Sequence, residues 1–259
     1  TRVRSSAASD VYKRQAGQKE ICLIPVATSG DTGKAALEGF SDVAGTGVIV
    51  FYPYGGVSHT QRKQMVTTLG DNVSVVAVRG NFDDAQTAVK RAFGDAKLTA
   101  DLAALGCKMT GANSINLGRL VPQAAYYFSA YADLLSSGQI KAGDEVDFAV
   151  PTGNFGNLLA GYYARRMGLP VGRLICASND NNVLTDFLRT GVYSLDREFI
   201  KTTSPSMDIL VSSNLERLLF EFAGRDGALI KEWMKQLREN GRYDIGKERL
   251  AEIRKIFVG

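Results

Sequence analysis

The sequence is poor in the residues that metal sites, disulfide frameworks and histidine-based catalysis require. It has one histidine and three cysteines, and the cysteines are far apart in the chain. Without a CxxC motif, a structural zinc site is disfavoured. A Ser-His-Asp triad would have to use His59, which stands in the loop-like stretch GVSHTQRKQM. Cys22 and Cys176 lie in apolar runs, so we expect them to be reduced and buried.

Long apolar runs and blocks of one charge are also missing. No run approaches the roughly 18 apolar residues of a membrane span. The net charge is only +4, and the basic residues are scattered, which disfavours nucleic acid as a partner. The chain of 259 residues can form one large α/β domain or two lobes. We expect a cytoplasmic protein that binds a small molecule and neither nucleic acid nor a membrane, and the oligomeric state stays open.

Short β-branched runs alternate with helical patterns, which predicts parallel sheets covered by helices on both faces. The near-continuous apolar character of the strands is typical of strands buried on both faces. The expected strands are 21–27, 47–52, 73–78, 146–150 and 173–178. The expected helices are 32–41, 58–69, 83–94, 114–136, 156–168, 181–190 and 213–223, with less regular ones at 227–239 and 247–257. The fold class is α/β, with two lobes built on open parallel sheets.

The alternation pauses in the polar segment 107–117, CKMTGANSINL, where we place the seam between lobes. A smaller lobe is expected at 19–112, and residues 113–259 are expected to form part of a larger lobe. Residues 1–18 have a Ser/Ala/Arg-rich composition without periodicity and are interpreted as a non-native or disordered segment, with a transit peptide as the alternative. Tyr126, Tyr127 and Tyr131, in the helical pattern after the seam, are expected to pack in the core.

The stretch VPTGNFGNLLAGYYA, from Val150, joins an expected strand directly to an expected helix. Ligands of open α/β sheets gather at the carboxyl ends of strands. Glycines at 153 and 156 allow backbone conformations that a side chain would forbid, and N–H groups at a helix start favour an anion. Asn154 and Asn157 add neutral donors. The turn predicts a cup for a phosphate monoester, although glycine turns before helices are also common without a ligand.

The tripeptide Gly-Asn-Phe occurs a second time from Gly80. There Asp83 and Asp84 follow at the expected helix start, where carboxylates cap the helix and repel an anion. The second copy is therefore interpreted as helix capping.

A dense group of short polar side chains follows the strand 21–27 in ATSGDTGKAALEGF. A Walker motif is excluded because Thr28 replaces its first glycine and Ala35 its Ser/Thr. Two interpretations stay open: a grip on a ligand carboxylate, or helix N-capping alone. The side chains concerned are Thr28, Ser29 and Thr32.

Three further stretches carry polar turns. TGANSINLGRL supplies Asn113, Ser114 and Arg119, which suit a second phosphate or carboxylate, although Arg119 can equally be a helix-surface residue. In SPSMDILVSSNLERLL, Ser213 and Glu216 predict a capping box, and the polar SPSMD before it has no assigned purpose. ASNDNNVL (177–184) is interpreted as a capped strand-to-helix turn.

Together these segments resemble threonine synthase, in particular its bacterial and fungal branch. The stretches ATSGDTGKAALEGF, FDDAQ, ANSINLGRLVPQ, VPTGNFGNLLAGYYA, ICASNDNNVLTDF and SPSMDILVSSNLERLL occur in the order and spacing of that family, over about residues 19 to 225. The resemblance implies the tryptophan-synthase-β-like fold, fold type II of the pyridoxal-phosphate enzymes. It also implies pyridoxal 5′-phosphate as cofactor and O-phosphohomoserine as substrate, converted with water to threonine and phosphate.

The resemblance assigns roles to residues of these turns. It places the cofactor's 5′-phosphate in the loop Gly153, Asn154, Phe155, Gly156 and Asn157. It places Asp31 near the oxygen of the cofactor ring. It assigns the substrate carboxylate to Thr28, Ser29 and Thr32, and the substrate phosphate to Asn113, Ser114 and Arg119.

One departure from the family is severe. The family's Schiff-base lysine precedes ATSGDTG in a Phe-Lys-Asp-like motif, and no such motif occurs here; Lys13 and Lys19 stand in a different context. We therefore expect an internal fragment of threonine synthase that is inactive alone. The alternatives are another lyase of the same fold, such as a serine/threonine dehydratase, and a lysine-less protein that binds phosphorylated metabolites.

Overall fold

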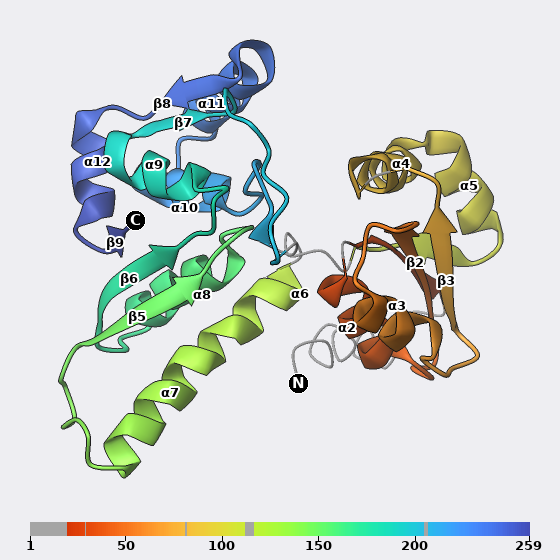
Figure 1. Ribbon diagram of the computed structural model, residues 1–259, viewed down its shortest axis with the longest axis horizontal. Coiled ribbons are helices and arrows are strands. Elements are labelled where there is room, and N and C mark those ends of the chain that lie inside the picture. The colour runs from red at the N-terminus through yellow and green to blue at the C-terminus, as the bar shows by residue number, and fades with distance from the viewer. Residues whose placement is uncertain (1–19, 29, 81, 112–116, 205–206) are drawn as a thin grey trace. The chain divides into compact units, whose positions relative to one another are not determined.

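A computed structural model of the chain describes residues 20–28, 30–80, 82–111, 117–204 and 207–259 (Figure 1). The chain divides into two compact units, one that ends at Arg119 and one that begins at Leu120. The sequence places this division between residues 112 and 113. Each unit has its own sheet and its own hydrophobic core.

The first unit is built on a parallel sheet with the strand order β3-β2-β1-β4. Cys22 of β1 lies opposite Thr46 of β2 and opposite Lys108 of β4. The strands are β1 (Ile21–Ala27), β2 (Thr46–Pro53), β3 (Val73–Val78) and β4 (Cys107–Met109). The helices are α2 (Asp31–Phe40), α3 (His59–Val66), α4 (Phe82–Gly94) and α5 (Ala96–Ala104), with α6 (Leu117–Leu120) across the boundary.

Helices cover both faces of this sheet. Ile24 and Val26 of β1 belong to a core cluster with Leu37 of α2 and Met65 of α3. Ala27, at the end of β1, belongs to a second cluster with residues of α4. Strand β3 differs from the expectation of strands buried on both faces, because its residues are half-buried or exposed at the edge of the sheet.

The second unit combines a parallel sheet, in the order β5-β6-β9, with a separate antiparallel pair, β7 and β8. The strands are β5 (Val146–Pro151), β6 (Val171–Ala177), β7 (Val192–Ser194), β8 (Arg242–Asp244) and β9 (Phe257–Val258). The helices are η1 (Val121–Gln123), α7 (Ala124–Ser136), α8 (Gly156–Arg166), α9 (Val183–Thr190), α10 (Leu215–Phe222), α11 (Gly227–Asn240) and α12 (Lys247–Arg254).

All five predicted strands are present, and the α/β class is confirmed. The expected helix 114–136 is interrupted by the 3-10 turn η1, which contains Pro122; proline lacks the N–H that a continuous helix needs. Cys22 and Cys176 are buried and form no disulfide within the described residues, as expected. Tyr127 and Tyr131 are buried, whereas Tyr126 is half-buried. No helix in the described ranges is long and apolar enough to cross a membrane.

Candidate functional site

The turn between β5 and α8 places residues 153–157 at the carboxyl end of a parallel strand (Figure 1). Phe155 has φ 60° and ψ 4°, in the left-handed region, and α8 begins at Gly156. The sequence predicts that the glycines carry the unusual backbone conformation. This is wrong, because neither Gly153 nor Gly156 has a positive φ and the strain falls on Phe155. A strained non-glycine residue persists only where its surroundings hold it, and such residues cluster at ligand sites.

Burial of the Phe155 ring compensates for the strained backbone of this residue. The residue is only 1% exposed, and its ring centroid lies 5.6 Å from that of Phe257 in β9. Burying an aromatic side chain stabilises by about 1.5–3 kcal/mol, which offsets a backbone cost of about 1–3 kcal/mol. The core of the second unit therefore fixes the turn in this conformation.

The N–H donors of this turn are not used by the part of the chain that the structure describes. No described group accepts a hydrogen bond from the backbone N–H groups of residues 153–157. The side-chain nitrogens of Asn154 and Asn157 also donate to no described residue, and Phe155 provides no side-chain cap. Such N–H groups at a helix start, without a carboxylate among residues 153–157, are suited to an anion. We call residues 153–157 the phosphate cup.

The acceptors of the cup, in contrast, are occupied by the segment before α10. The Ser212 hydroxyl donates to the Gly153 carbonyl at 2.9 Å. Both the backbone N–H and the side-chain amide of Asn214 donate to the Asn154 carbonyl, each at 3.1 Å. The Ser213 hydroxyl donates to Oδ1 of Asn154 at 3.2 Å. These bonds pair the carbonyls of Gly153 and Asn154 with residues 212–214, whereas the N–H groups of the cup have no acceptor among the described residues.

The first turn of α8 is held by α7. The Tyr127 hydroxyl donates to the Asn157 carbonyl at 2.8 Å. Burial raises the pKa of Tyr127 far above its ordinary value of about 10, so the hydroxyl stays protonated and can donate. Gly161 permits the close approach, because a Cβ there would lie 2.6 Å from the Tyr127 ring and 2.8 Å from Leu174.

Two capping predictions are wrong. Ser213 and Glu216 form no capping box, because α10 is preceded by Asn214 without a side-chain cap and the Ser213 hydroxyl turns to Asn154 instead. Helix α9 is preceded by Asn182, which also gives no side-chain cap. The Asn182 side chain accepts from Arg197 at 3.0 Å. In both places a bond to a distant segment replaces the local cap.

In the first unit, the turn after β1 contains Thr28, Asp31 and Thr32. The Thr28 hydroxyl is buried and accepts the N–H groups of Gly30 and Gly33, each at 2.9 Å. The bond to Gly33 caps an N–H of the first turn of α2, whereas Gly30, the residue before the helix, gives no side-chain cap. The grip on a ligand carboxylate by Thr28, Ser29 and Thr32 stays a prediction. The cap fills the acceptor capacity of Thr28 and leaves only its proton for a ligand.

Asp31 is exposed at the first turn of α2. Its Oδ1 accepts from Nε2 of Gln61 at 2.9 Å, and Gln61 is also part of the capping box of α3 with Ser58. Thr32 is half-buried beside it. The turn after β1 and the start of α3 are therefore joined through one glutamine.

The remaining predicted residues are placed as follows. Arg119 is half-buried in the last turn of α6. Ser29, Asn113 and Ser114 lie outside the described residues, and so does the side chain of Asp83. Among the residues that the structure describes, no group of three or more His, Cys, Asp and Glu side chains could hold a metal ion.

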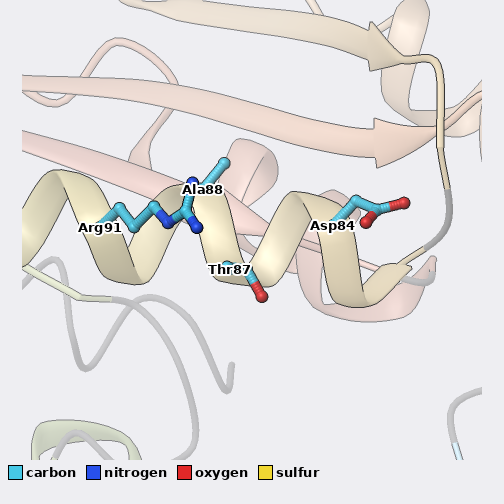
Figure 2. A pocket seen from close by; sticks show the side chains of 4 residues that line it. All are labelled: Asp84, Thr87, Ala88 and Arg91. Atoms are coloured by element: carbon cyan, nitrogen blue, oxygen red, sulfur yellow. The ribbon is translucent and has the colours of Figure 1, made fainter.

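A shallow hollow of about 460 Å³ lies along α4 (Figure 2). It is lined by Asp84, Thr87, Ala88 and Arg91, which come from a single helix. Among the described residues that line it, none is predicted to bind the cofactor or the substrate. One side of one helix gives a ligand few converging groups, so the hollow is a poor candidate beside the phosphate cup.

The sequence did not predict which residues form hydrogen bonds to the carbonyls of the cup. Ser212, Asn214 and Tyr127 contact it through backbone carbonyls, and no motif marks such contacts. Ser213 was assigned to a cap, and Tyr127 to packing alone.

Comparison with known proteins gives a consistent result. No family model matches the chain. Threonine synthase-like 1 of Homo sapiens is 47% identical over 243 residues, covering 91% of this chain and 33% of that protein. Threonine synthase of Pseudomonas aeruginosa is 42% identical over 238 residues, covering 92% of this chain and 48% of that enzyme. The chain thus spans about a third to a half of the length of these relatives.

A solved structure agrees with the sequence comparison. The crystal structure of threonine synthase from Brucella melitensis with bound pyridoxal phosphate superposes with a TM-score of 0.84 at 44% identity. The match covers 94% of this chain and 50% of that one. The chain is thus a homologue of threonine synthase, with the fold type II architecture of that enzyme, over the part of its length that it spans.

Proposed function

We propose that this chain provides the phosphate cup and the substrate-binding turns of a threonine synthase, which converts O-phospho-L-homoserine and water to L-threonine and phosphate. The observation that carries the proposal is the phosphate cup, with five consecutive N–H groups at the start of α8 that donate to no described residue. The relatives at 38–47% identity and the pyridoxal-phosphate-bound structure from Brucella melitensis support it.

The residues of the cup fit the 5′-phosphate of pyridoxal phosphate. Neutral N–H donors and the dipole of α8 stabilise a phosphate without any lysine or arginine of the turn. The amides of Asn154 and Asn157 add donors at its rim. The cofactor, when bound, supplies the electron sink that permits protons to leave the substrate carbons.

The substrate-binding roles rest on the resemblance. Thr28 and Thr32, with Ser29, would bind the substrate carboxylate, and the Thr28 hydroxyl can do so only as a donor because its oxygen already caps α2. Arg119, with Asn113 and Ser114, would hold the substrate phosphate. Asp31 would lie near the oxygen of the cofactor ring. A cation held at the leaving phosphate stabilises the charge that develops when the C–O bond breaks.

The cup is tested with a ligand that has no aldehyde and therefore labels no surface lysine. Calorimetry would compare pyridoxine 5′-phosphate with pyridoxine on the purified chain. We expect the phosphorylated form to bind at least about tenfold more tightly, because charge-assisted hydrogen bonds to the phosphate contribute about 1.5–3 kcal/mol each. Equal affinities would overturn the assignment of the cup.

A single substitution in the cup sharpens this test. Asn157→Asp places a negative charge at the start of α8, where it favours the helix but repels a phosphate. We expect it to lower the affinity for pyridoxine 5′-phosphate at least about tenfold and to leave that for pyridoxine unchanged. The matched control is Asn182→Asp at the start of α9, where the same change has no phosphate to repel.

The reaction is tested on the complete protein encoded by the gene that contains these residues. Phosphate release from O-phosphohomoserine in the presence of pyridoxal phosphate, with threonine as the second product, would support the proposal. Deamination of serine or threonine without phosphate release would support the dehydratase alternative. Binding of phosphorylated metabolites with no turnover would support the lysine-less binding protein.

A further inference from the structure

A segment far away in the sequence forms hydrogen bonds to the backbone carbonyls of the phosphate cup. Ser212 and Asn214 bind the carbonyls of Gly153 and Asn154, and 59 residues separate Ser212 from Gly153. This segment, residues 210–214, is itself fixed by Tyr193 of β7. The Tyr193 hydroxyl accepts the N–H of Ser212 at 2.9 Å and donates to the carbonyl of Leu210 at 2.7 Å. The Tyr193 hydroxyl thus links Leu210 and Ser212 through two hydrogen bonds, and we call this pair of bonds the bridge.

The side chain of Tyr193 is held in place by burial and by aromatic packing. It is only 1% exposed. Its ring stacks on that of Tyr243 with a centroid distance of 5.4 Å and an interplanar angle of 2°, and Trp233 stacks on Tyr243 at 6.1 Å. Phe187 packs edge-on at 5.9 Å. The aromatic stack therefore leaves the hydroxyl little freedom to move away from its two partners.

Burial also keeps this hydroxyl in the form that the bridge needs. The pKa of Tyr193 is raised to about 12, and loss of water around the ring is the main cause. The group therefore carries its proton throughout the physiological range and can donate to Leu210 while it accepts from Ser212.

We propose that Tyr193 is a positioning residue for the phosphate cup: through Ser212 it fixes the Gly153 carbonyl, and so it aims the N–H groups of the cup at one point. Tyr193 does not touch the ligand. The identity of the ligand as the phosphate of pyridoxal phosphate rests on the proposed function. The bridge itself does not, because it consists of bonds within the chain.

The energetic reason is preorganisation. A loop whose N–H groups converge before the ligand arrives does not lose conformational freedom on binding, and its dipoles need no reorganisation. Without the bridge, residues 210–214 keep their bonds to the cup but lose their own anchor. We therefore expect a variant without the hydroxyl to bind the phosphate less tightly even though every residue of the cup is intact.

The experiment compares Tyr193→Phe with Tyr243→Phe. Both changes remove one buried hydroxyl from the same aromatic stack and keep both rings. The Tyr243 hydroxyl makes no hydrogen bond to residues 210–214 or 153–157 in the described part of the chain. We expect Tyr193→Phe to weaken pyridoxine 5′-phosphate binding at least about fivefold, with pyridoxine unaffected. We expect Tyr243→Phe to leave both affinities unchanged.

A second measurement does not depend on any ligand. Hydrogen–deuterium exchange of the Asn214 amide, which donates to the Asn154 carbonyl of the cup, is expected to be faster in Tyr193→Phe than in the unsubstituted chain, and unchanged in Tyr243→Phe. Ser212→Ala, which removes only the bond to the Gly153 carbonyl, is expected to reproduce the faster exchange with a smaller effect on folding.

The outcomes separate the two proposals. If the unsubstituted chain does not prefer the phosphorylated ligand, the proposed function fails, and exchange still decides whether Tyr193 positions the cup. If the chain prefers the phosphorylated ligand but Tyr193→Phe changes neither affinity nor exchange, the positioning role is overturned. Equal effects of Tyr193→Phe and Tyr243→Phe would also overturn it, because they would reflect a general loosening of the stack.

Discussion

The hydroxyl oxygen of Thr28 lies 2.9 Å from the backbone nitrogen of Gly33 and accepts its N–H. The same oxygen accepts the N–H of Gly30, also at 2.9 Å. One side chain at the end of β1 thus satisfies two of the N–H groups that the start of α2 would leave unpaired. In this turn a residue assigned to ligand binding has a structural role of its own.

The first prediction concerns this cap. Thr28→Val keeps the shape of the side chain but leaves two buried N–H groups without an acceptor. We expect it to lower the free energy of unfolding by about 1–2 kcal/mol, in the absence of any ligand. Urea unfolding followed by far-UV circular dichroism measures this change. Thr28→Ser, which keeps the hydroxyl, should lose less; equal losses in the two variants would show that the methyl group and not the cap matters.

The second prediction concerns the space at Gly33. A Cβ there would lie 2.5 Å from Cγ2 of Thr28 and 2.8 Å from Cγ1 of Val50. These neighbours are buried core atoms that cannot move freely, so we expect Gly33→Ala to lower the free energy of unfolding by about 1–3 kcal/mol.

The control for Gly33 is Gly94→Ala in α4. A Cβ at Gly94 would meet nothing within 4 Å, and Gly94 has no positive φ. We expect the control to be neutral or to stabilise by up to about 1 kcal/mol, because alanine reduces the entropy of the unfolded chain. If both variants unfolded at the same urea concentration, the packing around Gly33 would not be tight.

The alternation of apolar runs and helical patterns was sufficient to predict the parallel sheets and the turn from β5 to α8, and the phosphate site at that turn stays a prediction. Strands such as β1 and β6 are more than six residues long, so their apolar pattern can be recognised in the sequence. In a parallel sheet of this kind, ligands are expected at the carboxyl ends of the strands. Strands β4, β7, β8 and β9 have two or three residues each, which is too short for any periodicity. Their pairing is decided by tertiary packing, and so they were missed.

The hydrogen bonds behind the cup could not be predicted for a different reason. Ser213 followed by Glu216 satisfies the local rule for a capping box, but the structure uses the Ser213 hydroxyl to bind Asn154, 59 residues away. A local pattern gives no information about which distant group competes for the same hydroxyl. The same holds for Phe155, whose left-handed backbone is stabilised by a ring packed against Phe257 and not by a local glycine.

The third prediction concerns the SPSMD segment, which had no assigned purpose. Asp208 accepts four hydrogen bonds: from Asn179 at 2.7 Å, Asn181 at 3.1 Å, and the hydroxyl and N–H of Thr202 at 2.7 and 2.9 Å. Its carboxylate thus joins the turn after β6 to the segment before α10. Asp208→Asn replaces one acceptor oxygen by a donor that faces other donors.

We expect Asp208→Asn to lower the free energy of unfolding by about 1–3 kcal/mol, measured by urea unfolding at pH 7. The control is Asp196→Asn, an exposed residue whose carboxylate accepts no hydrogen bond from the described residues. It should change stability by less than about 0.5 kcal/mol. A loss of the same size in both variants would mean that charge, and not the hydrogen bonds, is responsible.

The last prediction concerns pH. The Asp147 carboxylate in β5 accepts the backbone N–H of Arg173 at 2.7 Å and its guanidinium at 2.8 and 2.9 Å. These hydrogen bonds lower the pKa of Asp147 below its ordinary value. A carboxylate whose pKa is lower in the folded state binds fewer protons there than in the unfolded chain. Its contribution to stability is therefore complete above the unfolded pKa of about 3.9 and is lost as the pH falls through the folded pKa.

Asp147→Asn removes this contribution at every pH. We expect the variant to be less stable than the unsubstituted chain at pH 7, with a gap that narrows as the pH falls below about 4, because protonation then weakens the same hydrogen bonds in the unsubstituted chain. The gap is expected to be small, since the carboxylate is partly exposed and water screens it. Urea midpoints between pH 7 and pH 3 measure it, and a carbon-13 titration of the Asp147 carboxyl gives the folded pKa directly. A gap independent of pH would show that the substitution disturbs packing and that the pair with Arg173 does not contribute through charge.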